Sequence, residues 1–400
     1  MIIKNESALD GLKVLDLGRM IAAPFAAAIL ADMGADVIKV EMPGMGDLSR
    51  SMLPKDKGIS TYYEVFNRSK RGITLNLKSE AGKMAFGKLL RFTDVLIENF
   101  RPGVMHRMGF SYEEVKKINP KIIYTSISGY GQDGAYADRA CFDPIAQAMS
   151  GLMSVTGENC GESVRCGASI ADVLGGQNAV IAILAALEYR RKTGKGQQID
   201  IALVDSCISA LSSVNQLYFT NKKVPTHRGN SFEASAPGNS YHTRDGSSVV
   251  VLAGQNSEWS KLAQVLGHEE WLKMPEFAEV DSRVKNRKYL DSLISAETIK
   301  YERDELIGLL LKAKLPVAPI LSVDQVANDP YFRDTRHMYS VVKHPVLGKV
   351  MITNQPIKMS ETNPYVRSGA PLLGENNIDL YSKLGYKRNE IEKMKENGEI

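Results

Sequence analysis

The strongest constraint on the fold is an alternation, over the first 130 residues, of short β-branched runs with segments of helical periodicity. Such alternation is typical of βαβ units, which build a parallel sheet covered by helices. The expected strands are residues 13–17, 36–40, 72–76, 94–98 and 121–127. A helix is expected from Pro24 to Met33, before Gly34, and Ser79 is placed to cap another over residues 80–91. The sequence therefore predicts an α/β fold with an open parallel sheet.

The pattern changes after residue 220. Up to that point we expect a long helix over 170–191, a strand over 198–202 and a helix over 204–218. Residues 221–237 are polar, contain Gly and Pro and lack a helical period, which is typical of a linker or an active-site loop. Beyond them, up to about residue 338, a hairpin over 239–253 followed by helices predicts a smaller α+β unit.

The charge balance limits the class of partner. The chain of 400 residues has 50 Lys and Arg against 46 Asp and Glu, a net charge of +4, which is too small for a nucleic-acid-binding surface. Its four cysteines show neither a CxxC pair nor zinc-ligand spacing, so we expect reduced thiols and no metal. The N-terminus lacks a signal-peptide core, and polar residues interrupt the apolar stretch 170–187. A cytoplasmic protein without a membrane span is expected.

A GxGxxG match spans Gly129 to Gly134 after a predicted strand. A dinucleotide-binding loop would open a helix at once, but here the next helix is expected only near Asp143. We therefore interpret the match as a glycine-shaped loop at the end of a strand. No GxxxxGK[ST], HExxH or GxSxG is present, which removes support for P-loop, zincin and hydrolase functions.

The segment around Asp172 allows two interpretations. In a helix beginning near residue 170, Asp172 lies in the first turn and shares a face with Gly175, Gly176 and Ala179. Paired glycines weaken a helix, so a ligand or another backbone is expected to approach closely there. Alternatively, Ser169 and Asp172 form a variant capping box. In either case the helix dipole is expected to keep Asp172 ionised, as a nucleophile requires.

Basic residues cluster in residues 67–71, at Lys78 and in residues 99–107. Several of them follow predicted strands directly, where open α/β sheets bind ligands. We therefore expect an anionic, phosphate-bearing ligand. The six histidines have no ligand or triad spacing and are interpreted as structural or surface residues.

Several motifs together resemble the class III coenzyme A transferases, also called the CaiB/BaiF or formyl-CoA transferase family. The resemblance covers nearly the whole chain, and it is the combination of motifs that makes it specific. It rests on GLKVLDLGRMIAAP (11–24), GADVIKVE (34–41), NRSKRGITLNLKSEAG (67–82), ENFRPGVMHRMGF (98–110), SISGYGQDGAYADRACFDPIAQAMSG (126–151), the segment around Asp172, KTGKGQQIDIALVDS (192–206) and PLLGENNIDLYSKLGY (371–386).

The resemblance implies that Asp172 is the nucleophile of a CoA transfer between carboxylic acids. In such enzymes the aspartate attacks an acyl-CoA thioester to give a mixed anhydride, and the CoA thiolate then forms an aspartyl-CoA thioester. The acceptor acid collects the CoA through a second anhydride. CoA is thus a substrate, and no permanently bound cofactor is expected. A segment over 229–238 is expected to close over the reaction and exclude water.

Fifteen further positions match the family's CoA contacts. Two departures from the family pattern are notable. Met42 stands where formyl-CoA transferases often have Arg, and Phe142 stands where the related α-methylacyl-CoA racemases have a proton-relaying His. The implied contact residues are Ile21, Ala22, Met42, Leu75, Asn76, Leu77, Lys78, Asn99, Phe100, Arg101, Arg107, Ala140, Cys141, Phe142 and Asp143.

The resemblance further implies an interlocked homodimer whose large Rossmann-like domain is formed by residues 1–220 and 339–400. The linker and small α+β domain, residues 221–338, would be inserted between them. An α-methylacyl-CoA racemase remains the alternative activity, although Phe142 argues against it because Phe cannot carry a proton. A catalytically silent CoA-binding protein is a further alternative, against which the intact Asp172 argues.

Overall fold

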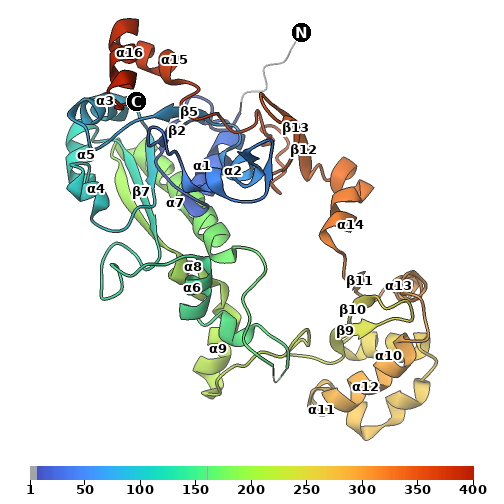
Figure 1. Ribbon diagram of the computed structural model, residues 1–400. Helices are drawn as coiled ribbons and strands as arrows, with labels where there is room; N and C mark the ends of the chain where they lie inside the picture. Colours follow the sequence, from blue (N-terminus) through green and yellow to red (C-terminus); the bar gives the residue numbers. More distant parts are fainter. Residues whose placement is uncertain (1–6, 160) are drawn as a thin grey trace. The chain divides into compact units, whose positions relative to one another are not determined.

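The computed structural model describes residues 7–159 and 161–400, and the chain forms two compact units (Figure 1). The first contains the residues up to Leu152, Arg165–Lys223 and Pro330–Ile400, and the second contains Met153–Val164 and Val224–Asp329. The segment Met153–Val164 was expected in the large domain but lies in the second unit, where the Gly157 carbonyl accepts a hydrogen bond from the Gly229 amide (2.8 Å). The expectations for Cys160 and for the first six residues lie outside the described residues.

The first unit is built on a parallel sheet with strand order β5-β2-β1-β6-β7-β8. The chain adds strands outward from β1 in one direction and then, from β6, in the other, which makes a doubly wound, Rossmann-like sheet. All six expected strands are present in it. They are β1 (Lys13–Asp16), β2 (Asp36–Glu41), β5 (Arg71–Thr74), β6 (Val95–Glu98), β7 (Ile123–Ser128) and β8 (Gln197–Ala202).

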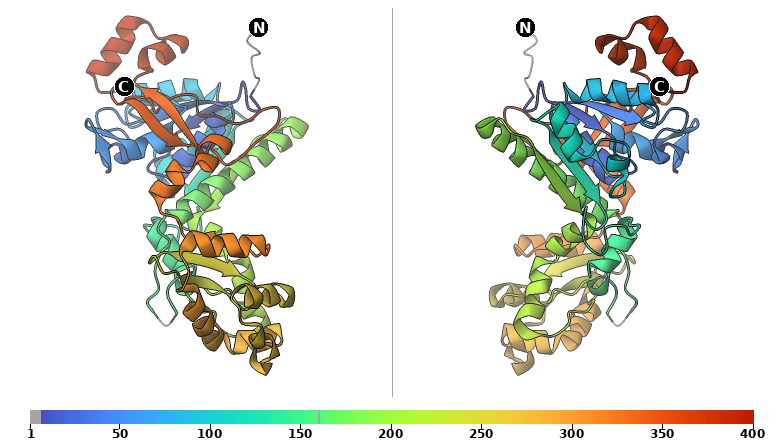
Figure 2. Two further views of the ribbon diagram at one scale, coloured as in Figure 1. Left: turned by 90° about the vertical axis from the view of Figure 1, so that its right-hand side faces the viewer. Right: turned by 90° about the vertical axis from the view of Figure 1, so that its left-hand side faces the viewer.

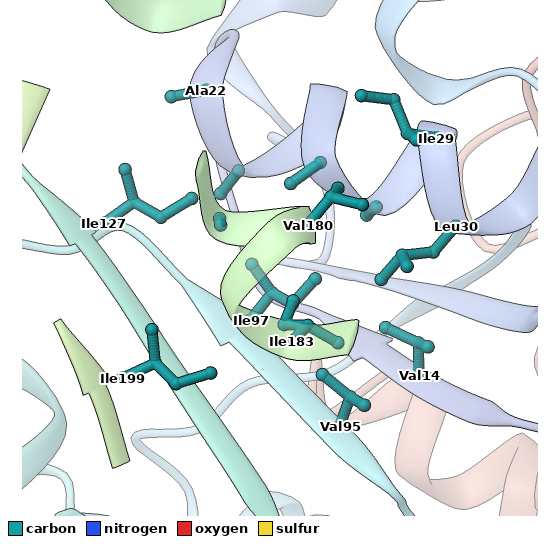
Figure 3. Packing of buried hydrophobic residues seen from close by; sticks show 14 of the residues in the cluster. Val14, Ala22, Ile29, Leu30, Val95, Ile97, Ile127, Val180, Ile183 and Ile199 are labelled. Atoms are coloured by element: carbon teal, nitrogen blue, oxygen red, sulfur yellow. The ribbon is translucent and has the colours of Figure 1, made fainter. Parts of the chain in front are cut away.

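Helices cover both faces of this sheet. On one face α1 (Ala22–Asp32) and α7 (Ile170–Thr193) pack together over an apolar core that includes Val14, Ile97 and Ile183 (Figure 3). The other face is covered by α3 (Glu80–Leu90), α5 (Tyr112–Ile118), α15 (Asn377–Lys383) and α16 (Arg388–Glu396), the last two from the end of the chain. The C-terminal helices are drawn in red in Figure 2.

The 24-residue helix α7 is long and apolar enough, by length and composition, to cross a membrane. Of its most apolar part, 39% is buried in the protein. Its buried face contacts α1, β7 and β8. These contacts identify α7 as a core helix that leaves a second, apolar face exposed.

The first unit also contains shorter elements. The single helix expected over 204–218 is divided at Leu211 into α8 (Leu203–Ala210) and α9 (Ser212–Asn221). The others are the hairpins β3 (Lys55–Asp56) to β4 (Ile59–Ser60) and β12 (Tyr339–His344) to β13 (Gly348–Thr353), the helices α2 (Thr61–Asn67), α4 (Val104–Arg107) and α6 (Asp143–Met149), a 3₁₀ turn at Leu48–Ser51 and a π-helical turn at Tyr331–Thr335.

The second unit has an antiparallel sheet of order β11-β10-β9, and its core stacks Trp259 on Trp271 with ring centroids 6.0 Å apart. The segment 229–238 is fastened within this unit, because Arg283 donates to the Ala236 carbonyl and Arg287 donates to the Ser235 carbonyl. The elements are β9 (Gly238–His242), β10 (Ser248–Leu252), β11 (Val317–Pro319), α10 (Asn256–Val265), α11 (Val280–Lys285), α12 (Arg287–Thr298), α13 (Arg303–Lys312), α14 (Val323–Asn328) and 3₁₀ turns at Met153–Val155, Glu269–Lys273 and Pro275–Phe277.

Candidate active site

A cavity of about 720 Å³ opens in the first unit where the strand order reverses. Its walls include residues 17–22, which follow β1, and Asn99–Arg101, which follow β6. Open α/β sheets bind their ligands at this position, because the loops leaving β1 and β6 diverge there and leave a crevice. The cavity is therefore the candidate active site.

Asp172 lies in the first turn of α7 and lines this cavity, as the sequence predicted. Burial, and secondly the nearby carboxylate of Asp143, raise the pKa of Asp172 to about 7. The expectation that the helix dipole keeps this group ionised is wrong in direction, because the loss of solvation outweighs the dipole. A carboxyl that titrates near neutrality combines a usable anionic form with increased basicity, which favours a role in catalysis.

The helix α7 begins without the predicted capping box. Ser169 occupies the N-cap position, but its side chain makes no capping hydrogen bond. Instead, Asp143 Oδ1 accepts a hydrogen bond from the backbone amide of Ala171 (2.9 Å). A carboxylate from α6 thus satisfies an amide of the first turn, which leaves Asp172 free of a capping role.

The two glycines in α7 are explained by close packing. A Cβ on Gly176 would lie 2.8 Å from the carbonyl oxygen of Ala22 in α1, so another backbone approaches there. A Cβ on Gly175 would lie 2.6 Å from Cδ2 of Leu203. The crossing of α7 with α1 therefore places Asp172, one turn earlier, near the N-terminus of α1.

Asp143 lines the cavity but is engaged in the protein. Its side chain is only 4% exposed, and its second carboxylate oxygen accepts from Gln147 Nε2 (2.8 Å). The Gln147 oxygen in turn accepts from the backbone amide of Cys166 (2.8 Å). Asp143 therefore anchors the segment that leads to Asp172.

Three other titratable side chains interact electrostatically with Asp172: Tyr62 on α2, Cys141 before α6 and Cys207 on α8. Burial, followed by Asp172, raises the pKa of Tyr62, and the same two causes raise the pKa of Cys141 to about 11. Burial raises the pKa of Cys207 as well. All three are thus uncharged at neutral pH, and Asp143 supplies the negative charge beside Asp172.

The loop after β1 is held by polar contacts on every side. Asp47 Oδ1 accepts from the Met20 amide (3.1 Å), and the Asn99 side chain accepts from the Arg19 amide (2.8 Å). The buried Lys39 donates to the Gly18 carbonyl and to Asp47 Oδ2. Met20 itself has a positive φ of 63°, a strained conformation for a side chain of this size. Such strain persists only where surrounding contacts enforce it.

A basic and aromatic group of side chains lies at the cavity. Lys78 and Arg101, predicted from sequence, line it together with Arg19, which sequence reasoning missed. The Arg19 guanidinium lies 4.9 Å from the ring centroid of Phe100. This group can meet phosphate oxygens and stack on a flat ring.

The structure brings most of the predicted residues together, but not all. Thirteen of the sixteen line the cavity, and three do not: Asn76, whose side chain accepts from the Lys78 amide, and Arg107 and Ala140, which are exposed. Among those missed is Tyr62, which lies in the first turn of α2. The start of this helix could have been predicted from Ser60, whose side chain caps it. The lining residues missed are Leu17, Gly18, Arg19, Met20, Val40, Glu41, Gly46, Asp47, Leu48, Tyr62, Val104, Met108, Ile127, Ser128, Gly129, Pro144, Ser169 and Leu203.

Comparison with known proteins identifies the family. The model described as CoA-transferase family III matches residues 9–377. Acetyl-CoA:oxalate CoA-transferase of Acetobacter aceti is 37% identical over 94% of this chain and 96% of its own length, and human succinyl-CoA:glutarate CoA-transferase is 35% identical over 96% and 87%. A crystal structure of a CAIB/BAIF family protein from Brucella suis, 36% identical, has a TM-score of 0.85 and covers 94% of this chain and 99% of that one. The chain belongs to CoA-transferase family III.

Proposed function

We propose that this protein transfers CoA from an acyl-CoA donor to a small carboxylic acid, with Asp172 as the nucleophile. One observation carries the proposal: a half-buried carboxyl with a pKa of about 7 lines a cavity at the reversal point of the sheet. The names of relatives that act on oxalate and glutarate support a small carboxylic acid as the acceptor.

The proposed reaction balances without an external proton. The Asp172 carboxylate attacks the thioester carbonyl, the C–S bond breaks, and CoA leaves as a thiolate while a mixed anhydride forms. The thiolate then attacks the aspartyl carbonyl and expels the donor carboxylate, leaving an aspartyl-CoA thioester. The acceptor carboxylate displaces the thiolate to form a second anhydride. Attack of the thiolate on the acceptor carbonyl releases the new acyl-CoA and regenerates Asp172.

We assign the binding of CoA to the cavity walls. Lys78, Arg101 and Arg19 would meet the phosphates, and Phe100 would offer a ring face to the adenine. Met42, which also lines the cavity, would make an apolar contact. The exposed Arg107 would contribute only through long-range attraction, since it lies outside the cavity walls.

We further propose an interlocked homodimer that works in the cytoplasm on soluble substrates, without nucleic-acid or membrane partners. Three exposed apolar side chains on α7, Ile181, Leu184 and Tyr189, support a second copy as the occupant of that helix face. The free thiols of Cys141, Cys166 and Cys207 support a reducing compartment.

The proposal is tested by trapping the covalent intermediate. Incubation with acyl-CoA followed by hydroxylamine or borohydride should modify Asp172, as located by mass spectrometry of peptides. Asp172→Asn, of nearly equal size, should lose both the modification and the exchange of CoA between two acids. Full exchange by Asp172→Asn would overturn the assignment.

The racemase alternative makes a different prediction. It requires exchange of the α-proton of an acyl-CoA with solvent in the absence of any acceptor acid. Phe142, which lines the cavity, cannot take part in that proton transfer. We therefore expect no deuterium wash-in at the α-carbon in heavy water.

A further inference from the structure

The side chains of Asp143 and Gln147 lie one helical turn apart on α6, and both are buried, with exposed fractions of 4% and 0%. Buried polar groups of this kind need hydrogen-bond partners, because a buried donor or acceptor without one destabilises the fold. Their partners are each other and two backbone amides of the segment that enters α7, as described above.

We propose that Asp143 and Gln147 are a positioning pair that aims the Asp172 carboxyl by holding the backbone of residues 166–171, and that neither side chain contacts the substrate. The inference rests on the proposed function, because it gives the pair the task of orienting a nucleophile. It revises the expectation from sequence that Asp143 is one of the residues that contact CoA.

The geometry supports this role at three points. The Ala171 amide, directly before Asp172, donates to Asp143 Oδ1, and the Cys166 amide, six residues before Asp172, donates to Gln147 Oε1. The bond between Gln147 Nε2 and Asp143 Oδ2 fixes the two side chains relative to each other. Both ends of the entering segment are thus tied to one rigid helix turn, which leaves Asp172 little freedom to move.

The pair also affects the charge state of the nucleophile. The titratable groups that face Asp172 are Tyr62 from α2, Cys141, Asp143 from α6 and Cys207 from α8. Of these, the carboxylate of Asp143 is the one that raises the pKa of Asp172, in addition to burial. Removing that charge is therefore expected to lower the pH at which Asp172 ionises.

An exchange of the two side-chain types tests the positioning role. In Asp143→Asn alone, the new amide meets the Gln147 amide, so two donors face each other and one hydrogen bond is lost in every arrangement. In Gln147→Glu alone, two carboxylates meet. In the double variant Asp143→Asn with Gln147→Glu, the amide introduced on the first turn of α6 donates to the carboxylate introduced one turn later, and both backbone amides keep an acceptor. All three hydrogen bonds are restored, and in the bond between the two side chains the donor and the acceptor exchange places.

We expect Asp143→Asn to lower kcat on the order of 10²-fold while the KM for acyl-CoA changes little, as for a misplaced reacting group. The double variant should recover kcat to within roughly tenfold of the parent. The acid limb of the pH profile of kcat/KM should move to lower pH in Asp143→Asn, which a loss of folding alone would not produce. Thermal unfolding and CoA binding measured by calorimetry show whether each variant is folded.

The outcomes separate the two proposals. If Asp172→Asn is inactive but Asp143→Asn keeps the parent kcat and pH profile, the positioning pair is wrong and the nucleophile stands. If Asp143→Asn raises KM with kcat unchanged, Asp143 contacts the substrate and the inference fails. A double variant whose kcat is no higher than that of either single variant also overturns the inference. Exchange activity in Asp172→Asn overturns the proposed function itself.

Discussion

Asp172 combines two demands that conflict at the level of a single residue. In its proposed role as nucleophile it must be ionised, but its burial and the Asp143 charge favour the neutral form and raise its pKa to about 7. The benefit is reactivity, since a poorly solvated carboxylate of higher pKa is a stronger nucleophile toward a thioester. The cost appears in the pH dependence and in the stability of the fold.

The pH dependence follows from the charge state of Asp172. In the proposed mechanism the ionised form attacks, so kcat/KM for the donor should fall about tenfold per pH unit below the pKa of about 7 and level off above it. Initial rates of CoA exchange between about pH 5 and pH 9 measure this profile. Circular dichroism at each pH serves as the control for folding. A flat profile across this range would show that Asp172 titrates elsewhere.

The raised pKa of Asp172 destabilises the fold at high pH, and the variant Asp172→Asn tests this effect. The folded-state pKa of about 7 lies above the usual value of 3.8, so the folded protein binds more protons than the unfolded chain between those values. Stability is therefore lost as pH rises through that window. Asp172→Asn removes this loss and should be more stable than the parent at pH 8 by about 2–4 kcal/mol, where the upper value corresponds to the full shift of about three pKa units.

The measurement for Asp172→Asn is thermal unfolding of parent and variant at about pH 4 and pH 8, on either side of the titration. The midpoints should nearly coincide at the acid value and separate at the alkaline one. An equal gain at both values would point to packing and not to charge.

The sequence predicted where Asp172 lies in its helix, but not which side chains hold that helix start in place. Its position at a helix start was readable from periodicity. Asp143 and Gln147, which bind the backbone of the segment before it, lie 29 and 25 residues earlier in the chain. Local patterns favoured Ser169 as the cap because it is adjacent, and the tertiary contact through Asp143 replaced it. Hydrogen bonds across such a separation leave no local signal.

At the level of elements, the crossing of α1 and α7 positions the site. The two helices approach so closely that Gly176 has no room for a Cβ against the Ala22 carbonyl. The sequence signalled a close approach here, because adjacent glycines weaken a helix. The sequence did not show whether a ligand or another backbone approaches the glycines. The packing of α7 against α1 shows that it is a backbone.

Two matched substitutions test this crossing. Gly176→Ala places a Cβ 2.8 Å from a backbone oxygen that cannot move away, whereas Gly175→Ala meets a flexible Leu203 methyl group at 2.6 Å. Either change gains about 1 kcal/mol of helix propensity. We expect Gly175→Ala to be nearly neutral and Gly176→Ala to destabilise by about 1–3 kcal/mol through overpacking.

Thermal unfolding midpoints and CoA exchange rates of the two variants check this prediction. Gly176→Ala should lower both the unfolding midpoint and the exchange rate more than Gly175→Ala does, since it displaces the helix that carries Asp172. Equal behaviour of the two variants would show that α1 moves freely, and the rigid crossing would then be wrong.

At the scale of the whole molecule, the alternation of strands and helices sufficed to predict an open parallel sheet, because its strands are short β-branched runs. The strand order that makes the sheet doubly wound came only from the structure. The placement of Met153–Val164 could not be read in the same way. That segment joins the second unit through backbone contacts such as Gly229 to Gly157, in which side-chain patterns play no part.

The outer face of α7 exposes apolar side chains to solvent. Ile181 is 65% exposed there and lies near Leu184, in a helix apolar enough to pass for a membrane span. An exposed apolar face of this kind marks an interaction site. We assign it to the second copy of the proposed homodimer.

Ile181→Glu places a charge on that face, and Met84→Glu on α3 is its control, because Met84 is equally exposed at 64% on a helix of the same unit. Because the two chains of an interlocked homodimer can separate only when they unfold, the unfolding midpoint should rise with protein concentration. Ile181→Glu should lower that midpoint at every concentration, since a charge is buried between subunits, while Met84→Glu should leave it within about 1 °C. Sedimentation equilibrium gives the mass of each variant. A monomeric parent, or a parent that co-floats with lipid vesicles through this face, would contradict the assignment of α7 to a subunit interface.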